Sequence, residues 1–86
     1  MPGRLLIVDD NVNILETAKD ILEDAGFEVR IAATIADALV CAQEATFDVA
    51  IIDLNLPDGT GLQLAQQLKA HRARSFRFPF LAILLF

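Results

Sequence analysis

Three aspartates stand directly after two of the most apolar segments of this 86-residue chain. Asp9 and Asp10 follow the run at residues 5–8, and Asp53 follows the run at residues 49–52. Short apolar runs of this kind are typical of strands buried on both faces of a parallel sheet, whose carboxyl ends meet at one edge. We therefore expect the three carboxylates to lie together. Because like charges repel and every donor is an oxygen, such a cluster needs a hard cation, Mg²⁺ or Mn²⁺.

A carboxylate beside such a cation can also act as a nucleophile. The metal would neutralise an incoming phosphoryl group while one aspartate attacks it in line. The simpler interpretation is that acids at strand ends are solvated loop residues. For one aspartate alone that interpretation is preferable, whereas three aspartates at equivalent strand ends favour a metal site.

Strand and helix patterns alternate along the whole chain. Strands are indicated by continuous or alternating apolar residues, and helices by apolar residues at helical spacing. The expected strands are residues 5–8, 27–32, 49–52 and 80–85, and the expected helices are residues 14–25, 35–45 and 62–71. This order predicts a single α/β domain over residues 1–86, a doubly wound parallel sheet of about four strands with three helices on its two faces. The first and third strands, the most apolar, should be central.

Several residues predict where the helices begin and end. Gly26 follows the first helix in the position that favours a left-handed backbone. Thr34 with Asp37, and Thr60 with Gln63, have the spacing of a capping box, in which two residues bond to each other's backbone amides. The stretch between Asp53 and Thr60 is rich in turn-forming residues and is expected to be a long loop.

Composition excludes several classes of protein. Hydrophobic residues make up 55% of the chain, so it has material for a core, and the net charge of −5 argues against a nucleic-acid-binding surface. All acidic residues lie at or before Asp58, and the charged residues after it are all basic. The start of the chain does not read as a secretion signal, and no apolar run approaches the roughly 20 residues that span a bilayer. We expect a soluble, cytoplasmic protein, with Cys41 as a small buried residue.

Two segments resemble the signature sequences of bacterial response-regulator receiver domains. They are VDDN at residues 8–11 and IIDLNLPDGTGL at residues 51–62. The resemblance covers residues 4–69 in order and spacing. It implies a flavodoxin-like fold that accepts a phosphoryl group from a partner histidine kinase, as part of a two-component signalling pathway.

The resemblance also implies roles for individual residues. Asp53 stands where the family has its phosphoacceptor, and Asp9 and Asp10 stand where it has the acid pair that binds Mg²⁺. Asn55 stands where a backbone carbonyl completes the metal site. Three further residues match the loop that shapes the rim of the pocket, namely Pro57, Gly59 and Gly61.

The last part of the chain departs from the family pattern. The family's fourth strand ends in a serine or threonine that contacts the phosphoryl group, whereas Leu84 or Leu85 falls at about that place here. The family's fifth strand ends in a lysine, and no lysine follows Lys69. The family's last helix, strand and helix have no counterpart in the sequence. If the family's strand order 2-1-3-4-5 holds, the fourth strand would be an edge and part of the face of the first helix bearing Ile14, Ile21 and Ala25 would be uncovered. This predicts either a homo-oligomer, with strand exchange as one form of it, or a poorly folded fragment.

Two alternatives to a phosphoacceptor remain open. A pseudo-receiver would keep the fold and act by docking or oligomerising without productive phosphorylation, as the missing hydroxyl and lysine suggest. An aspartate-nucleophile phosphatase of the haloacid dehalogenase type would need a second aspartate two residues after the nucleophile, and Asn55 occupies that position. We therefore expect a phosphoacceptor with at most self-dephosphorylation and not an enzyme, with no nucleic-acid or membrane partner for this chain.

Overall fold

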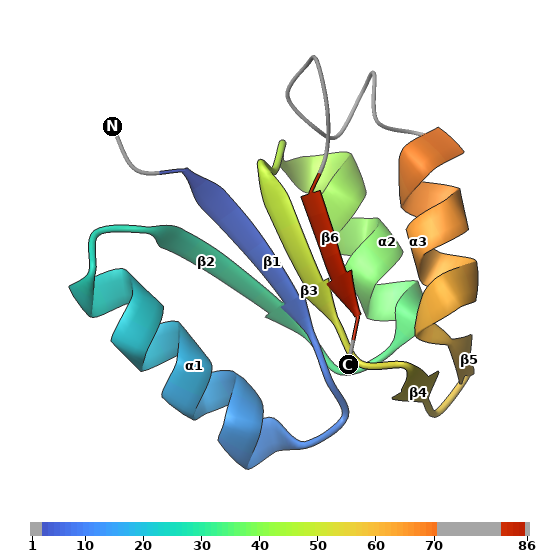
Figure 1. The fold of residues 1–86 in the computed structure, drawn as a ribbon, viewed down its shortest axis with the longest axis horizontal. Helices are drawn as coiled ribbons and strands as arrows, with labels where there is room; N and C mark the ends of the chain where they lie inside the picture. The colour runs from blue at the N-terminus through green and yellow to red at the C-terminus, as the bar shows by residue number, and fades with distance from the viewer. Residues whose placement is uncertain (1–2, 71–81, 86) are drawn as a thin grey trace.

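The computed structural model describes residues 3–70 and 82–85. These residues form a parallel sheet with helices on both faces (Figure 1). Along the chain the elements are β1 (Arg4–Val8), α1 (Val12–Asp24), β2 (Glu28–Ala32), α2 (Ile35–Glu44), β3 (Val49–Ile52), β4 (Asn55–Leu56), β5 (Gly59–Thr60), α3 (Gly61–Ala70) and β6 (Ala82–Leu85). The expected helix end at His71 and the expected strand start at residues 80–81 lie outside the described residues.

The four long strands lie in the order β2-β1-β3-β6, and every neighbouring pair is parallel. The expectation that the first and third strands are central is confirmed, since β1 and β3 occupy the interior of this sheet. Val8 pairs with Ala32 on one side and with Ile52 on the other, so the carboxyl ends of three strands are level with one another. The residues that follow these strands therefore emerge at the same edge.

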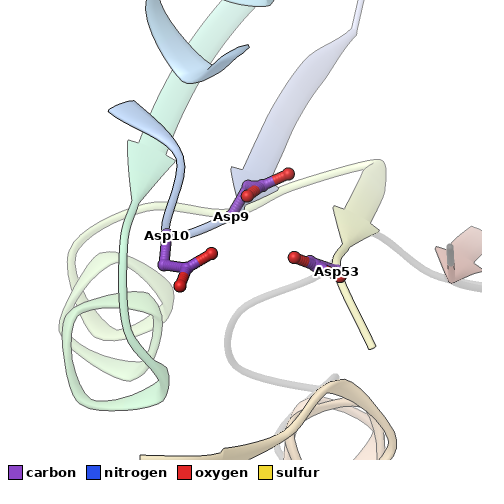
Figure 2. Close-up of side chains that lie close together, drawn as sticks. All are labelled: Asp9, Asp10 and Asp53. Atoms are coloured by element: carbon purple, nitrogen blue, oxygen red, sulfur yellow. The ribbon is translucent and has the colours of Figure 1, made fainter. Parts of the chain in front are cut away.

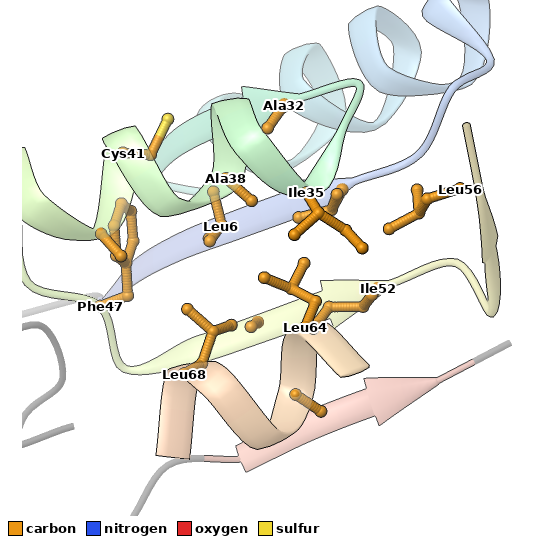
Figure 3. Packing of buried hydrophobic residues seen from close by; sticks show 14 residues of the cluster. Leu6, Ala32, Ile35, Ala38, Cys41, Phe47, Ile52, Leu56, Leu64 and Leu68 are labelled. Carbon is orange, nitrogen blue, oxygen red and sulfur yellow. The ribbon is translucent and has the colours of Figure 1, made fainter. Parts of the chain in front are cut away.

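Alternate residues of the strands pack into two separate hydrophobic cores, one on each face of the sheet. On one face Leu6 and Val8 of β1 are fully buried against α2 and α3, with Phe47 at the far end of the same cluster (Figure 3). On the other face Leu5 and Ile7 join a smaller cluster with residues of α1 and β2. A strand with both faces buried has to be apolar throughout, which explains the continuous run in the sequence.

The first helix is fixed at both ends by local hydrogen bonds. The side chain of Asn11 accepts a hydrogen bond from the amide of Ile14 at 3.3 Å. At the other end Gly26, with φ of 100°, donates to the carbonyl of Glu23, and the amide of Phe27 donates to the carbonyl of Leu22. This pair of bonds is the Schellman motif, and it confirms the position expected for Gly26.

The helix is only partly covered by the rest of the described chain. Leu15 is buried, but Ile14 is 47% exposed and Ile21 is 62% exposed. Ala25 is exposed as well. The expectation that this flank of α1 is uncovered is therefore confirmed.

Both expected cap residues are in place, but among the described residues only the second pair forms a complete capping box. The hydroxyl of Thr34 accepts from the amide of Asp37 at 3.0 Å at the start of α2. Before α3 the capping box is reciprocal, because the amide of Gln63 donates to the hydroxyl of Thr60 and the amide of Thr60 donates to the side-chain oxygen of Gln63. These bonds satisfy amides that have no partner within their own helix.

One segment differs from the sequence-based expectation. The stretch expected to be a long loop contains a small antiparallel hairpin, in which Asn55 of β4 pairs with Thr60 of β5 and Leu56 pairs with Gly59. Leu56 is 9% exposed and belongs to the larger core, so the hairpin is anchored to the body of the protein.

None of the helices in the described part of the chain is long and apolar enough to cross a membrane.

Candidate metal centre

The three aspartates singled out in the sequence meet at the carboxyl edge of the sheet. Asp9 and Asp10 leave the end of β1, Asp53 leaves the end of β3, and one carboxylate oxygen from each lies within 4.8 Å of the other two. Figure 2 shows the side chains of Asp10 and Asp53 turned toward each other, with Asp9 beside them. The expected convergence is a direct result of the level ends of neighbouring parallel strands.

Asp9 is the innermost of the three. It is 4% exposed, and its carboxylate accepts a hydrogen bond from the amide of Asn11 at 2.9 Å. Its own amide donates to the carbonyl of Ala32 at 3.1 Å, which ties it to the end of β2. A buried carboxylate held from both its backbone and its side chain keeps one orientation, as a metal ligand requires.

Asp53 is held in place chiefly by its backbone. Its amide donates to the carbonyl of Val8 at 2.9 Å, so the ends of β1 and β3 are joined at the site. Its side chain accepts from the amide of Asn55 at 3.3 Å. Asp53 is half-buried and Asp10 is exposed, so the cluster opens to solvent on one side.

The donor set fits a hard divalent cation. The cluster offers carboxylate oxygens, and no histidine or cysteine joins it among the described residues. The ion pairs found among those residues, Arg4 with Glu28 and Arg30 with Glu44, leave the three aspartates out. Three acids without a basic partner suit Mg²⁺ or Mn²⁺, which take oxygen ligands and keep several waters.

The glycines expected at the pocket rim allow two close approaches. A side-chain carbon on Gly61 would collide with the backbone carbonyl oxygen of Asp53, and the amide of Gly61 donates to the carbonyl of Leu54 at 2.8 Å. A side-chain carbon on Gly59 would lie 2.7 Å from the Ile35 side chain. Pro57 stands in the turn between β4 and β5. These residues shape the segment that follows Asp53 and do not belong to the acidic cluster itself.

Asp58 has a structural role that the sequence did not reveal. One oxygen of its carboxylate accepts from the amide of Ile35 at 2.8 Å, and the other accepts from the amide of Ala36 at 3.1 Å. The hydrogen bond from Ile35 is the main cause that holds the pKa of Asp58 below its ordinary value; desolvation opposes it, and the hydrogen bond from Ala36 adds to the lowering. An aspartate followed by glycine reads simply as a turn, so no local signal pointed to a helix 23 residues earlier.

The end of β6 lies next to the site. Leu85 pairs with Ile52, the residue before Asp53, and Leu84 pairs with Ile51. The resemblance noted above would require a serine or threonine near this point, and all four residues of β6 are apolar. The described part of β6 therefore supplies no hydroxyl group.

The sequence matches a known family over most of its length. Residues 5–82 match the family model described as the response regulator receiver domain. The alginate biosynthesis transcriptional regulatory protein AlgB of Pseudomonas putida is 39% identical over 67 residues, which are 78% of this chain and 15% of that protein. The sensor histidine kinase AtsR of Burkholderia thailandensis is 36% identical over 64 residues, 74% of this chain and 11% of that protein. The chain therefore spans a small part of the length of these relatives.

Solved structures agree with the observed fold. A CheY-like response regulator receiver domain from Methylobacillus flagellatus has a TM-score of 0.76 at 40% identity, over 81% of this chain and 59% of that chain. The response regulator TrrA from Thermotoga maritima, solved in complex with Mg(2+)-BeF, has a TM-score of 0.75 at 32% identity, over 85% of this chain and 63% of that chain. The expected flavodoxin-like fold is thus confirmed.

Proposed function

Since this chain belongs to the response regulator receiver domain family, we propose that it accepts a phosphoryl group on Asp53 in a reaction that depends on Mg²⁺. The observation that carries the proposal is the meeting of Asp9, Asp10 and Asp53 within 4.8 Å at the end of two central strands. Asp53 acts as the nucleophile, and the two acids from the β1 end hold the cation. The backbone carbonyl of Asn55 is the fourth ligand that the family resemblance implies.

Phosphoryl transfer to Asp53 requires mainly that the protein align the reacting groups and neutralise their negative charge. A carboxylate oxygen of Asp53 forms a bond to phosphorus while the bond from phosphorus to the donor's leaving group breaks on the opposite side. The transition state is loose and rich in negative charge. A bound Mg²⁺ would neutralise part of that charge. The hydrogen bonds to Asp9 and Asp53 keep the ligand set and the nucleophile in fixed orientations.

We propose a histidine kinase as the donor, and a phosphoacceptor role in place of enzymatic turnover. The similarity to AtsR, which is itself called a sensor histidine kinase, supports a place in this type of pathway. An aspartate-nucleophile phosphatase is disfavoured because Asn55 stands where its general acid would be, and an amide cannot donate a proton as a carboxylic acid does. The amide of Asn55 already bonds to the side chain of Asp53.

One observation favours a second function, that of a pseudo-receiver. The backbone of β6 pairs with Ile51 and Ile52, and all four residues of β6 are apolar. Without a hydroxyl group at this strand to bind the phosphoryl oxygens, phosphorylation would have a smaller effect on the conformation. The chain would then act by docking or self-association.

Labelling with a small phosphodonor separates the two functions. The wild-type chain is incubated with radiolabelled acetyl phosphate and Mg²⁺, and the acyl phosphate is identified by its sensitivity to hydroxylamine. Asp53→Asn should carry no label, whereas Asp37→Asn, which removes an exposed aspartate outside the acidic cluster, should be labelled like the wild type. Label that persists in Asp53→Asn would identify another acceptor, and an unlabelled wild type would favour the pseudo-receiver.

A further inference from the structure

The hairpin that follows Asp53 is attached to the start of α2 by one side chain. Asp58 lies in the turn between β4 and β5, and its two carboxylate oxygens accept from the first two amides of α2, at 2.8 Å for Ile35 and 3.1 Å for Ala36. Asp58 and Ile35 are 23 residues apart in the sequence. The contact is therefore tertiary, and it joins the site segment to an element on one face of the sheet.

The attachment completes the capping of α2. The third amide, that of Asp37, donates to the hydroxyl of Thr34, and the fourth, that of Ala38, donates to the backbone carbonyl of Thr34. The first turn of a helix carries a partial positive charge and unpaired amides, so a carboxylate is a favourable partner there. Both Thr34 and Asp58 therefore cap the start of α2. The bond to Thr34 is local, whereas the bonds to Asp58 attach the β4–β5 turn to the helix.

The same hairpin is continuous with the acidic site. Asn55 pairs with Thr60 across the hairpin, and the amide of Asn55 donates to the carboxylate of Asp53. Gly59, next to Asp58, packs so closely on Ile35 that an added side-chain carbon would lie 2.7 Å from it. Any movement of the turn away from α2 would therefore be passed to the backbone at Asn55.

We propose that Asp58 is a positioning residue of the metal site: by holding the β4–β5 turn against the first turn of α2, it fixes the backbone of residues 53–55 that binds the cation. This inference rests on the proposed function, because it concerns the same cation. Asp58 does not belong to the acidic cluster; it acts through the hairpin. Its loss should weaken Mg²⁺ binding as well as the helix.

The test compares Asp58→Ala with variants that share one of its effects. Thr34→Ala also removes a cap of α2 but leaves the hairpin attached. Asp37→Asn removes one negative charge from the same helical turn. Asp58→Asn removes the charge of Asp58 and keeps one acceptor oxygen. The dissociation constant of Mg²⁺ is measured for each 86-residue chain by titration of its ¹⁵N–¹H correlation spectrum.

We expect Asp58→Ala to raise the dissociation constant by up to about ten-fold, the low end of what residues outside the ligand set contribute to metal affinity. The amides of residues 53–56 should shift in this variant without metal. Thr34→Ala and Asp37→Asn should stay within about two-fold of the wild type, and Asp58→Asn should lie between wild type and Asp58→Ala. If Asp58→Ala does not fold, the dissociation constant of Asp58→Asn is compared with those of the wild type and the two controls instead.

Three results would overturn the inference. If the folded Asp58 variants bind Mg²⁺ as tightly as the wild type, Asp58 acts only as a helix cap. An equal loss of affinity in Asp37→Asn and Asp58→Asn would assign the effect to charge alone. A wild-type chain that folds and shows no response to Mg²⁺ would remove the proposed function and this inference together, whereas the first two results leave the proposed function standing.

Discussion

Gly61 lies against the backbone carbonyl oxygen of Asp53 with no room for a side-chain carbon between them. The neighbouring side chain of Ile52 would lie 2.9 Å from such a carbon. Since backbone atoms cannot rotate aside, an added methyl group must push the end of β3 away from the start of α3. Gly61, the residue after the hairpin, therefore also fixes the backbone of Asp53, the proposed nucleophile.

The first prediction follows from this contact. Gly61→Ala should lower the free energy of unfolding by about 1–3 kcal/mol, the usual cost of forcing extra atoms into a packed site. The midpoint of urea unfolding measures it. Leu62→Ala is the control: Leu62 is 55% exposed at the next position of α3, and its loss should change stability by no more than about 0.5 kcal/mol. Equal stability of Gly61→Ala and the wild type would contradict the contact.

The second prediction concerns the repulsion among the three aspartates. Asp10→Asn removes one of three like charges that lie within 4.8 Å of one another. It should raise the urea midpoint in the absence of metal and weaken Mg²⁺ binding at least about ten-fold, since a ligand is lost. A gain in stability together with a loss of Mg²⁺ affinity would indicate that the three carboxylates are placed for binding and not for stability. A variant that is less stable than the wild type and binds Mg²⁺ equally well would show that Asp10 is not a ligand.

The third prediction concerns the local cap of α2. Thr34→Ala removes the acceptor for the amide of Asp37 and should cost about 1 kcal/mol. Thr34→Ser, which keeps the hydroxyl, should recover most of that loss. A neutral Thr34→Ala would mean that water replaces the hydroxyl without cost.

The fourth prediction is a dependence on pH. The pKa of Asp58 is lowered in the folded chain, chiefly by the hydrogen bond from Ile35, so its ionised form stabilises the fold. That contribution is complete above the ordinary aspartate pKa of about 3.9 and is lost as the pH falls through the lower folded value. The difference in unfolding free energy between wild type and Asp58→Ala should therefore shrink on acidification. The cost of Thr34→Ala, which involves no titrating side chain, should persist, and a constant Asp58 difference would contradict the assignment.

The fifth prediction is self-association through the uncovered side of α1. Ile14 and Ile21 are exposed, and β6 ends the sheet of described strands. We expect sedimentation to show an association that increases with concentration, and Ile21→Lys should weaken it. Val40→Lys, at a 51% exposed position of α2, is the control and should leave it unchanged. A single monomeric species at all concentrations would refute this expectation.

The sequence was sufficient for the features that follow from periodicity. Continuous apolar runs required β1 and β3 to be interior, and interior parallel strands required the acids after them to converge. The caps at Thr34 and Thr60 were predictable because each depends on residues only three positions apart. Such local rules survive folding unless tertiary contacts override them.

The features that the sequence does not predict depend on tertiary contacts. A two-residue strand has no periodic signal, so the sequence predicts a loop where the structure has the hairpin of Asn55–Leu56 and Gly59–Thr60. The partnership of Asp58 with Ile35 depends on where the fold places two distant segments. The apolar spacing of α1 alone does not say how far a covering surface extends: Leu15 is buried and Ile21 is 62% exposed, although both belong to the same apolar pattern.

The interior placement of β1 and β3 also bears on how long the acidic site survives thermal opening of the sheet. The hydrogen bond from the Asp53 amide to the Val8 carbonyl belongs to the central pair of strands, with another strand beyond each of them. Partial openings begin with the outermost elements, where the fewest contacts must break. If β6 or β2 detaches briefly, the junction between the two halves of the site remains closed. The Asp53 amide should therefore exchange with solvent deuterium among the slowest in the chain, and the side chain of Asp53 should keep its position through fluctuations that open the outer strands.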